Sequence, residues 1–133
     1  MFETAAKPSY RRISADTARR VIGDKGFGVT VVDVRTVEEY AEAHLPGAVL
    51  IPDFALADRA AAELPDKNAP IVVYCMSGCR SYSAAQTLIA LGYTEVYDFG
   101  TVYNWRWERE SGIEHPERYP QASSPSACGV SRG

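Results

Sequence analysis

Residues 71–80 read Ile-Val-Val-Tyr-Cys-Met-Ser-Gly-Cys-Arg, and this stretch decides the fold. Its first four residues are apolar, which is typical of a strand buried on both faces of a sheet. Small residues then form a loop, and residues 80–91 have the pattern of a helix that ends at Gly92. A buried strand, a short loop and a helix in this order predict one βα unit of a parallel sheet.

The rest of the chain repeats this order of short apolar strands and helices. Further strands are predicted at residues 29–34, 48–51 and 95–99. Helices, taken with their N-caps, are predicted at residues 14–23, 36–43, 53–64 and 101–110. Thr36 and Glu39 have the spacing of a capping box, which favours a helix start at this point. The whole pattern implies βα units around a mostly parallel sheet.

The composition is that of an ordinary globular chain, and its 133 residues are enough for one domain. A net charge of −3 gives no general attraction to nucleic acid or to an anionic membrane, and no apolar run approaches the length of a membrane-spanning helix. The N-terminal stretch lacks the apolar core of a secretory signal, so we expect a cytoplasmic location. We expect the domain to cover residues 1–111. Pro, Ser and Gly then become frequent, which predicts a peripheral or mobile tail over residues 112–133.

Cys75 stands at the carboxyl end of the strand predicted at 71–74, where doubly wound α/β domains bind their ligands. The loop after it can curl so that its backbone N–H groups point at one spot, and the next helix adds the positive end of its dipole. These groups and the nearby Arg80 favour the thiolate, the nucleophilic form of cysteine. The local pattern leaves open the alternative that Cys75 is an inert core cysteine.

Three segments of the chain carry a family resemblance. They are residues 32–48 with VDVR, EEY and HLPGA, residues 74–81 with YCMSGCRS, and residues 91–105 with LGY, VY, FG and W. In these motifs and in their order, the chain resembles the rhodanese family, whose active-site loop is a Cys, four residues and an Arg. The resemblance extends from about Ser14 to Trp107. It implies a rhodanese-like α/β domain, with a central parallel sheet of about five strands and helices on both faces.

The resemblance also implies an activity, that of a sulfurtransferase. Cys75 would take a sulfane sulfur from thiosulfate or a persulfide, carry it as its own persulfide, and pass it to a thiophilic acceptor such as a small thiol or a protein. No metal or organic cofactor is implied, and neither nucleic acid nor a membrane is expected as a partner. The backbone amides that would hold the transferred sulfur belong to Met76, Ser77, Gly78, Cys79 and Arg80.

Two other functions are weighed against this one. Cysteine-dependent phosphatases have a related loop with five residues between Cys and Arg, whereas here there are four, and an acid for such a reaction is left open between Asp66 and Asp98. A non-catalytic rhodanese-like module that binds a partner or senses redox state is the second alternative. The intact Cys75 and Arg80 weigh against it.

Several residues depart from the family pattern or call for a structural interpretation. An apolar Met76 makes the site mouth less cationic, so thiosulfate is expected to be a mediocre donor. Cys79 raises the hypothesis of a disulfide with Cys75 or of sulfur handover, although a small packing residue is the simpler interpretation. Cys128 is a resolving thiol only if the tail folds back. Asp33 and Arg35 stand at the end of a neighbouring strand and could reach the rim of the site. We favour a structural role for them, because a charge at a buried strand end needs a partner.

Overall fold

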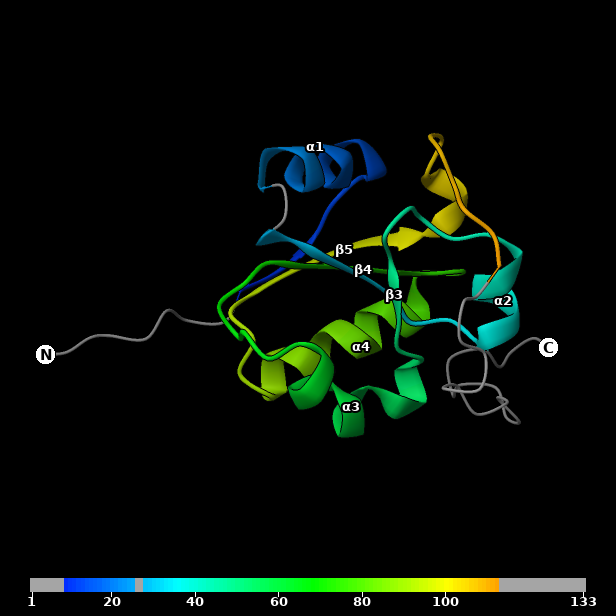
Figure 1. The fold of residues 1–133 in the computed structure, drawn as a ribbon. Coiled ribbons are helices and arrows are strands. Elements are labelled where there is room, and N and C mark those ends of the chain that lie inside the picture. Colours follow the sequence, from blue (N-terminus) through cyan, green and yellow to red (C-terminus); the bar gives the residue numbers. More distant parts are fainter. Residues whose placement is uncertain (1–8, 26–27, 113–133) are drawn as a thin grey trace, which may run out of the picture.

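The computed structural model describes residues 9–25 and 28–112 (Figure 1). In this part of the chain a five-stranded sheet has the spatial order β1-β5-β4-β2-β3, and every neighbouring pair is parallel. The strands are β1 (Ser9–Arg12), β2 (Thr30–Asp33), β3 (Val49–Leu50), β4 (Ile71–Cys75) and β5 (Glu95–Thr101). This order, with β4 at the centre, brings the carboxyl ends of β2, β4 and β5 to one edge of the sheet.

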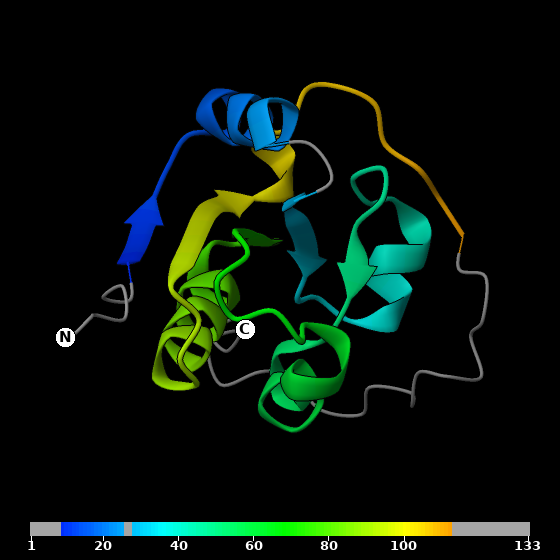
Figure 2. The ribbon, with the colours of Figure 1, turned by 60° about the vertical axis from the view of Figure 1, so that its left-hand side comes forward.

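The helices between the strands lie on both faces of this sheet. The described α-helices are α1 (Ala15–Lys25), α2 (Val37–Glu42), α3 (Leu56–Glu63) and α4 (Cys79–Ala90), and two short 3-10 helices are η2 (Asp53–Ala55) and η3 (Val102–Asn104). Figure 1 shows α1 on one face and α3 with α4 on the other, and Figure 2 shows α2 beside β3 at the edge. None of the helices described is long and apolar enough to cross a membrane.

The central strand β4 is buried along its whole length. Side chains of a strand alternate between the two faces of its sheet. Val73 and Cys75 accordingly belong to the core shared with α3 and α4, whereas Val72 and Tyr74 belong to the core shared with α1. Because both faces of β4 are covered, its residues form an unbroken apolar run. The alternation of side chains between the two faces places Cys75 on the face that α4 covers.

The register between β4 and β5 shifts at the end where the two strands approach the Cys75 loop. Val73 pairs with Asp98, but the next residue, Tyr74, pairs with Gly100, so Phe99 has no partner in this ladder. An extra residue of this kind bends a strand locally and changes which residue lies opposite its neighbour. Here the change brings a glycine, without a side chain, to the edge where the loop begins.

The structure confirms the α/β fold, the parallel sheet of five strands and the helices on both faces. The capping box of Thr36 and Glu39 is present at the start of α2. β1 has no counterpart among the predicted strands, because its sequence, SYRR, is polar and its exposed edge needs no apolar run. The start of the helix predicted at 53–64 is also imprecise, since the 3-10 helix η2 forms its first turn and α3 begins only at Leu56.

Two predicted helix ends are wrong. α1 does not stop at Gly23 and continues to Lys25, because a glycine lowers helix propensity without breaking a helix. The final helix predicted at 101–110 is limited to the three residues of η3, and Trp105 then takes an extended backbone conformation. Trp105 packs in the α1-side core with Phe99, and this packing outweighs local helix propensity. The predicted boundary at residue 111 remains a prediction, since residues 113–133 lie outside the described residues.

Candidate active site

The loop that follows β4 surrounds the sulfur of Cys75. This cysteine is fully buried, and its thiol is free. Its Sγ accepts hydrogen bonds from the backbone N–H of Gly78 at 2.9 Å and from that of Ser81 at 3.2 Å. The Ser81 amide belongs to the first turn of α4, whose N–H groups have no partner within the helix. Two backbone dipoles and a helix N-terminus therefore face one sulfur atom, an arrangement that stabilises negative charge on it.

Gly78 makes the tight loop possible. Its backbone has a φ of +88°, in the left-handed region that side-chain-bearing residues rarely adopt. The loop also passes close to the end of β5, because a Cβ at Gly78 would lie only 3.6 Å from the Cα of Gly100. The turn at this position reverses the chain from β4 into α4 within three residues, so that the amides of Gly78 and Ser81 both reach the sulfur.

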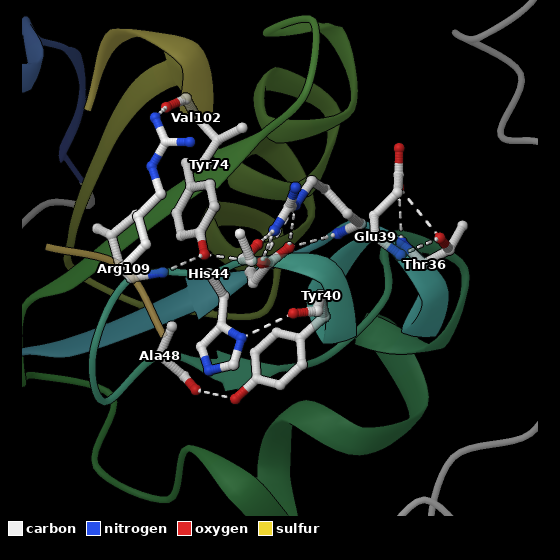
Figure 3. Close-up of polar contacts among 12 residues, drawn as sticks. Thr36, Glu39, Tyr40, His44, Ala48, Tyr74, Val102 and Arg109 are labelled. Carbon is white, nitrogen blue, oxygen red and sulfur yellow. Dashed lines mark hydrogen bonds and ion pairs between the residues drawn. The ribbon is translucent and has the colours of Figure 1, made fainter. Parts of the chain in front are cut away.

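Arg80 carries the positive side chain of the loop, and Glu39 on α2 holds it in place. Nη1 and Nη2 of Arg80 donate to the two carboxylate oxygens of Glu39 at 3.0 and 3.1 Å. Glu39 also accepts from the backbone N–H of Thr36 at 2.9 Å (Figure 3). Burial alone would raise the pKa of Glu39, but the hydrogen bonds from Arg80 and Thr36 outweigh it, and the pKa lies below its ordinary value. The Arg80 charge is thus compensated, and the backbone amides are the donors that contact Sγ.

A buried polar network supports the site from β2 (Figure 3). Arg35 donates to the carboxylate of Asp33 at 2.7 Å and to the carbonyl of Ala43 at 2.6 Å. The hydroxyl of Tyr74 donates to the same carboxylate at 2.7 Å and accepts from the backbone N–H of Leu45 at 3.1 Å. Burial and the neighbouring Asp33 charge raise the pKa of Tyr74. The structural interpretation of Asp33 and Arg35 is confirmed, because each satisfies the other at the buried end of β2.

A cavity of about 220 Å³ lies beside the loop and is lined by Met76, Tyr103 and Arg109, among others. The Tyr103 hydroxyl contacts the Met76 sulfur at 3.4 Å. Arg109 donates to the carbonyl of Val102 at 3.1 Å (Figure 3). It also donates to the carbonyl of Trp105 at 2.7 Å. A larger cavity, of about 680 Å³, lies beside α1 and is lined by Trp105 among others, but Cys75 and its loop do not line it. The small cavity next to Met76 therefore adjoins the site.

Neither of the two acids considered for a phosphatase reaction is placed to act on Cys75. Asp98 is fully buried and accepts hydrogen bonds from Tyr10, Arg12 and the Gly100 backbone. Asp66 caps the turn that leads into the opposite, amino-terminal end of β4. The site thus contains a nucleophile and anion-stabilising amides, without an acid from either candidate.

The predicted site residues come together in one loop, but they do not all touch the sulfur. On Sγ itself, the Gly78 N–H is a donor, whereas the Cys79 N–H donates to the Ser77 hydroxyl at 3.4 Å. That the amides of Met76, Ser77, Gly78, Cys79 and Arg80 hold the transferred sulfur stays a prediction. Cys75 is not bonded to Cys79, and Cys128 lies outside the described residues. Ser81 was missed; its place in the first turn of the helix after Cys75 was the available signal.

Two further residues near the loop were not anticipated as part of the site. Glu39 was identified only as a capping residue, and Asp53 only as a helix start. Asp53 follows β3 at the same edge of the sheet as Cys75, and that position was a usable signal. Burial raises the pKa of Asp53, and the nearby positive charge of Arg80 opposes this effect.

Comparison with known proteins gives consistent matches. The family model for the rhodanese-like domain matches residues 14–106. The chain is 41% identical over 69 residues to thiosulfate sulfurtransferase PspE of Escherichia coli strain K12, covering 52% of this chain and 66% of that protein. It is 32% identical over 110 residues to thiosulfate sulfurtransferase GlpE of Stutzerimonas stutzeri strain A1501, covering 82% and 96%. A solved rhodanese with anions from E. coli matches with a TM-score of 0.60 at 34% identity, over 63% of this chain and 99% of that one.

Proposed function

Because the chain belongs to the rhodanese-like domain family, we propose that it is a sulfurtransferase that carries a sulfane sulfur on Cys75. The observation that carries this proposal is the pair of backbone N–H groups, from Gly78 and Ser81, on the sulfur of Cys75. Hydrogen bonds of this kind favour the thiolate and would equally stabilise the anionic outer sulfur of a persulfide. Relatives named thiosulfate sulfurtransferase support the same activity.

The proposed reaction has two steps, and Cys75 takes part in both. The Cys75 thiolate attacks the outer sulfur of a donor, a new S–S bond forms, and the donor leaves with the electron pair of the bond that breaks. With thiosulfate the leaving group is sulfite; with an organic persulfide it is a thiolate. An acceptor thiolate or cyanide then attacks the outer sulfur of the persulfide and releases the Cys75 thiolate. The four-residue spacing between Cys75 and Arg80 supports a single sulfur atom as the transferred group.

As the donor we propose an organic persulfide. Arg80 is engaged by both carboxylate oxygens of Glu39, and the adjoining cavity is lined by the apolar Met76 and the acidic Glu42 as well as by Arg109. A doubly charged thiosulfate ion therefore meets no uncompensated loop arginine. We expect thiosulfate to load Cys75 more slowly than a small organic persulfide at equal concentration, and a comparison of initial loading rates checks this. Faster loading by thiosulfate would contradict the donor assignment while leaving the sulfurtransferase activity intact.

Intact-protein mass spectrometry tests the proposed function directly. The reduced protein is incubated with polysulfide, and we expect a mass gain of one sulfur, with fragment ions that locate it on Cys75 and not on Cys79. The gain should disappear in Cys75→Ser. A matched control is Ser83→Ala, an exposed position on α4 beyond the loop, which should load like the wild type.

A second measurement separates the proposed activity from a binding module. Cyanide is added to the loaded protein, and we expect the sulfur to leave as thiocyanate with return of the original mass. An unloaded wild type whose Cys75 alkylates like an ordinary exposed thiol would instead favour the non-catalytic rhodanese-like module. The proposed cytoplasmic location is tested separately, by fractionation of cells that express the tagged full chain.

A further inference from the structure

Arg12 links the edge strand β1 to the loop around Cys75. It is the last residue of β1 and precedes the segment 14–106 that matches the family model. Its Nη2 donates to the carbonyl of Gly78 at 3.0 Å, and its Nε donates to the carboxylate of Asp98 at 3.1 Å. One planar guanidinium therefore bridges a buried carboxylate and the loop backbone, a geometry that arginine provides and lysine does not.

Asp98 fixes the position of that guanidinium. The carboxylate is fully buried and also accepts from the Tyr10 hydroxyl at 2.9 Å and from the Gly100 backbone N–H at 2.9 Å. Burial alone would lower the pKa of Arg12, but its interactions with Tyr10 and Asp98 outweigh this, and the pKa lies above its ordinary value. The charged guanidinium is thus held beside Gly78 and Gly100. A Cβ at Gly100 would lie 3.3 Å from its Nη1, which is closer than an ordinary contact.

The contact with Gly78 sets the direction of one peptide group in the loop. The Gly78 carbonyl accepts from Arg12 and from the Ser81 hydroxyl at 3.3 Å. In a planar trans peptide the carbonyl and the following N–H point in opposite directions, and no described peptide bond is cis. The N–H of Cys79 consequently points away from Arg12. Its contact with Ser77 is 3.4 Å, longer than a usual N–H···O bond, so a stronger acceptor can take the place of the Ser77 hydroxyl.

We propose that Arg12 is a positioning residue for sulfur transfer, which holds the Gly78–Cys79 peptide so that the Cys79 N–H is presented to the outer sulfur of a Cys75 persulfide. This inference rests on the proposed function. A cationic donor on the carbonyl also polarises the peptide group, which strengthens its N–H as a hydrogen-bond donor. Arg12 touches no reacting atom and acts through the loop backbone alone.

Arg12→Gln tests this role, and Arg11→Gln is its matched control. Arg11 is the preceding residue on the same edge strand and is likewise exposed. Two rates are measured for each variant: sulfur loading from polysulfide by mass spectrometry, and alkylation of unloaded Cys75 by iodoacetamide across a pH series. The alkylation profile needs no sulfur transfer, so it reports on the loop even if the proposed function fails. A wild type that never loads would reject the function separately.

We expect loading of Arg12→Gln to be slower by roughly threefold to tenfold, the range that the loss of one hydrogen bond produces. Its Cys75 should also alkylate more slowly near neutral pH, because a misaligned loop directs its amides at the sulfur less well. Arg11→Gln should stay within about twofold of the wild type in both rates.

A merely structural role for Arg12 makes a different prediction. Arg12→Gln leaves the buried Asp98 carboxylate with one cationic partner fewer, which lowers stability. Adding Asp98→Asn removes that charge and should restore the melting temperature. If loading and the alkylation profile also return to wild-type values in the double variant, then Arg12 contributes only to stability, and the proposal is wrong. Rates of Arg12→Gln equal to those of Arg11→Gln would overturn it as well.

Discussion

At the scale of single residues, the site depends on backbone conformation more than on side-chain chemistry. The two donors to the Cys75 sulfur are both main-chain N–H groups, and Gly78, with its φ of +88°, directs them. A Cβ at this position would meet Arg12 Nη1 at 3.5 Å and the Gly100 Cα at 3.6 Å, which are ordinary contacts. The requirement for glycine is therefore conformational and not steric.

Gly78→Ala should lower the free energy of unfolding by about 1–2 kcal/mol, the cost of a left-handed backbone for an L-residue. The loop can relieve this strain only by turning its amides away from Cys75, so alkylation and sulfur loading should slow too. Gly47→Ala is the control, because Gly47 has a φ of +77° in open space. It should show the same loss in urea unfolding with no change at Cys75. Equal reactivity of the two variants would contradict the assigned role of Gly78.

At the scale of elements, one ion pair joins α2 to the loop before α4. Glu39 both completes the capping box of α2 and holds Arg80. The pKa of Glu39 lies below its ordinary value of about 4.3. A carboxyl whose pKa is lowered by folding adds stability above its ordinary pKa, and this contribution disappears as the pH falls through the lower, folded value. The link between the two elements should therefore weaken only in acid.

Glu39→Gln should reduce the free energy of unfolding at neutral pH by about 1–3 kcal/mol, because it leaves the largely buried Arg80 guanidinium without its carboxylate. The difference from the wild type should shrink toward zero as the pH falls through the folded pKa of Glu39. Urea unfolding over a pH series measures this. Glu38→Gln, the exposed neighbour on the same helix, should leave the profile nearly unchanged. A pH-independent difference for Glu39→Gln would disprove the linkage.

Elements with local signals could be predicted, and elements fixed by distant contacts could not. The capping box at Thr36 depends on a Glu three residues later, and β4 is a continuous apolar run, so both can be recognised in the sequence. β1 pairs with β5, about 85 residues away along the chain, through backbone groups that no sequence pattern marks. The same holds for the site. Cys75 and its loop follow from motif and strand end, whereas Arg12 and Glu39 reach it from remote segments.

At the scale of the whole molecule, the two faces of the sheet are covered differently. α3 and α4 cover the Cys75 face, while the other face has α1 and the aromatic chain segment after β5 (Figure 2). Trp105 lies between Phe99 and Trp107 in this segment, with ring centroids 5.8 and 4.8 Å away. Aromatic side chains thus take the place that a helix at 101–110 would have filled.

Trp105→Ala should destabilise the protein by about 3–5 kcal/mol, as for other large buried aromatics truncated to alanine. The tryptophan is 7% exposed, and Tyr103, two residues earlier, is 67% exposed. Tyr103→Ala is therefore the matched control and should change stability by only about 0.5 kcal/mol. Urea unfolding followed by circular dichroism measures both. Similar losses for the two variants would show that Trp105 does not hold the α1 face.

The two outer strands of the sheet, β1 and β3, also affect whether copies of the protein aggregate. A parallel sheet leaves unpaired N–H and C=O groups along each outer strand, and such rows can template aggregation. Here β3 has only two residues, and β1 has four, of which the last two are arginines. Within residues 9–25 and 28–112, neither outer strand offers a long, uncharged row to a neighbouring chain. The short strand β1, which places Arg12 at the loop, therefore also opposes the pairing of its sheet with the sheet of another molecule, because it is charged. Concentrated solutions of the protein should stay free of β-rich aggregates.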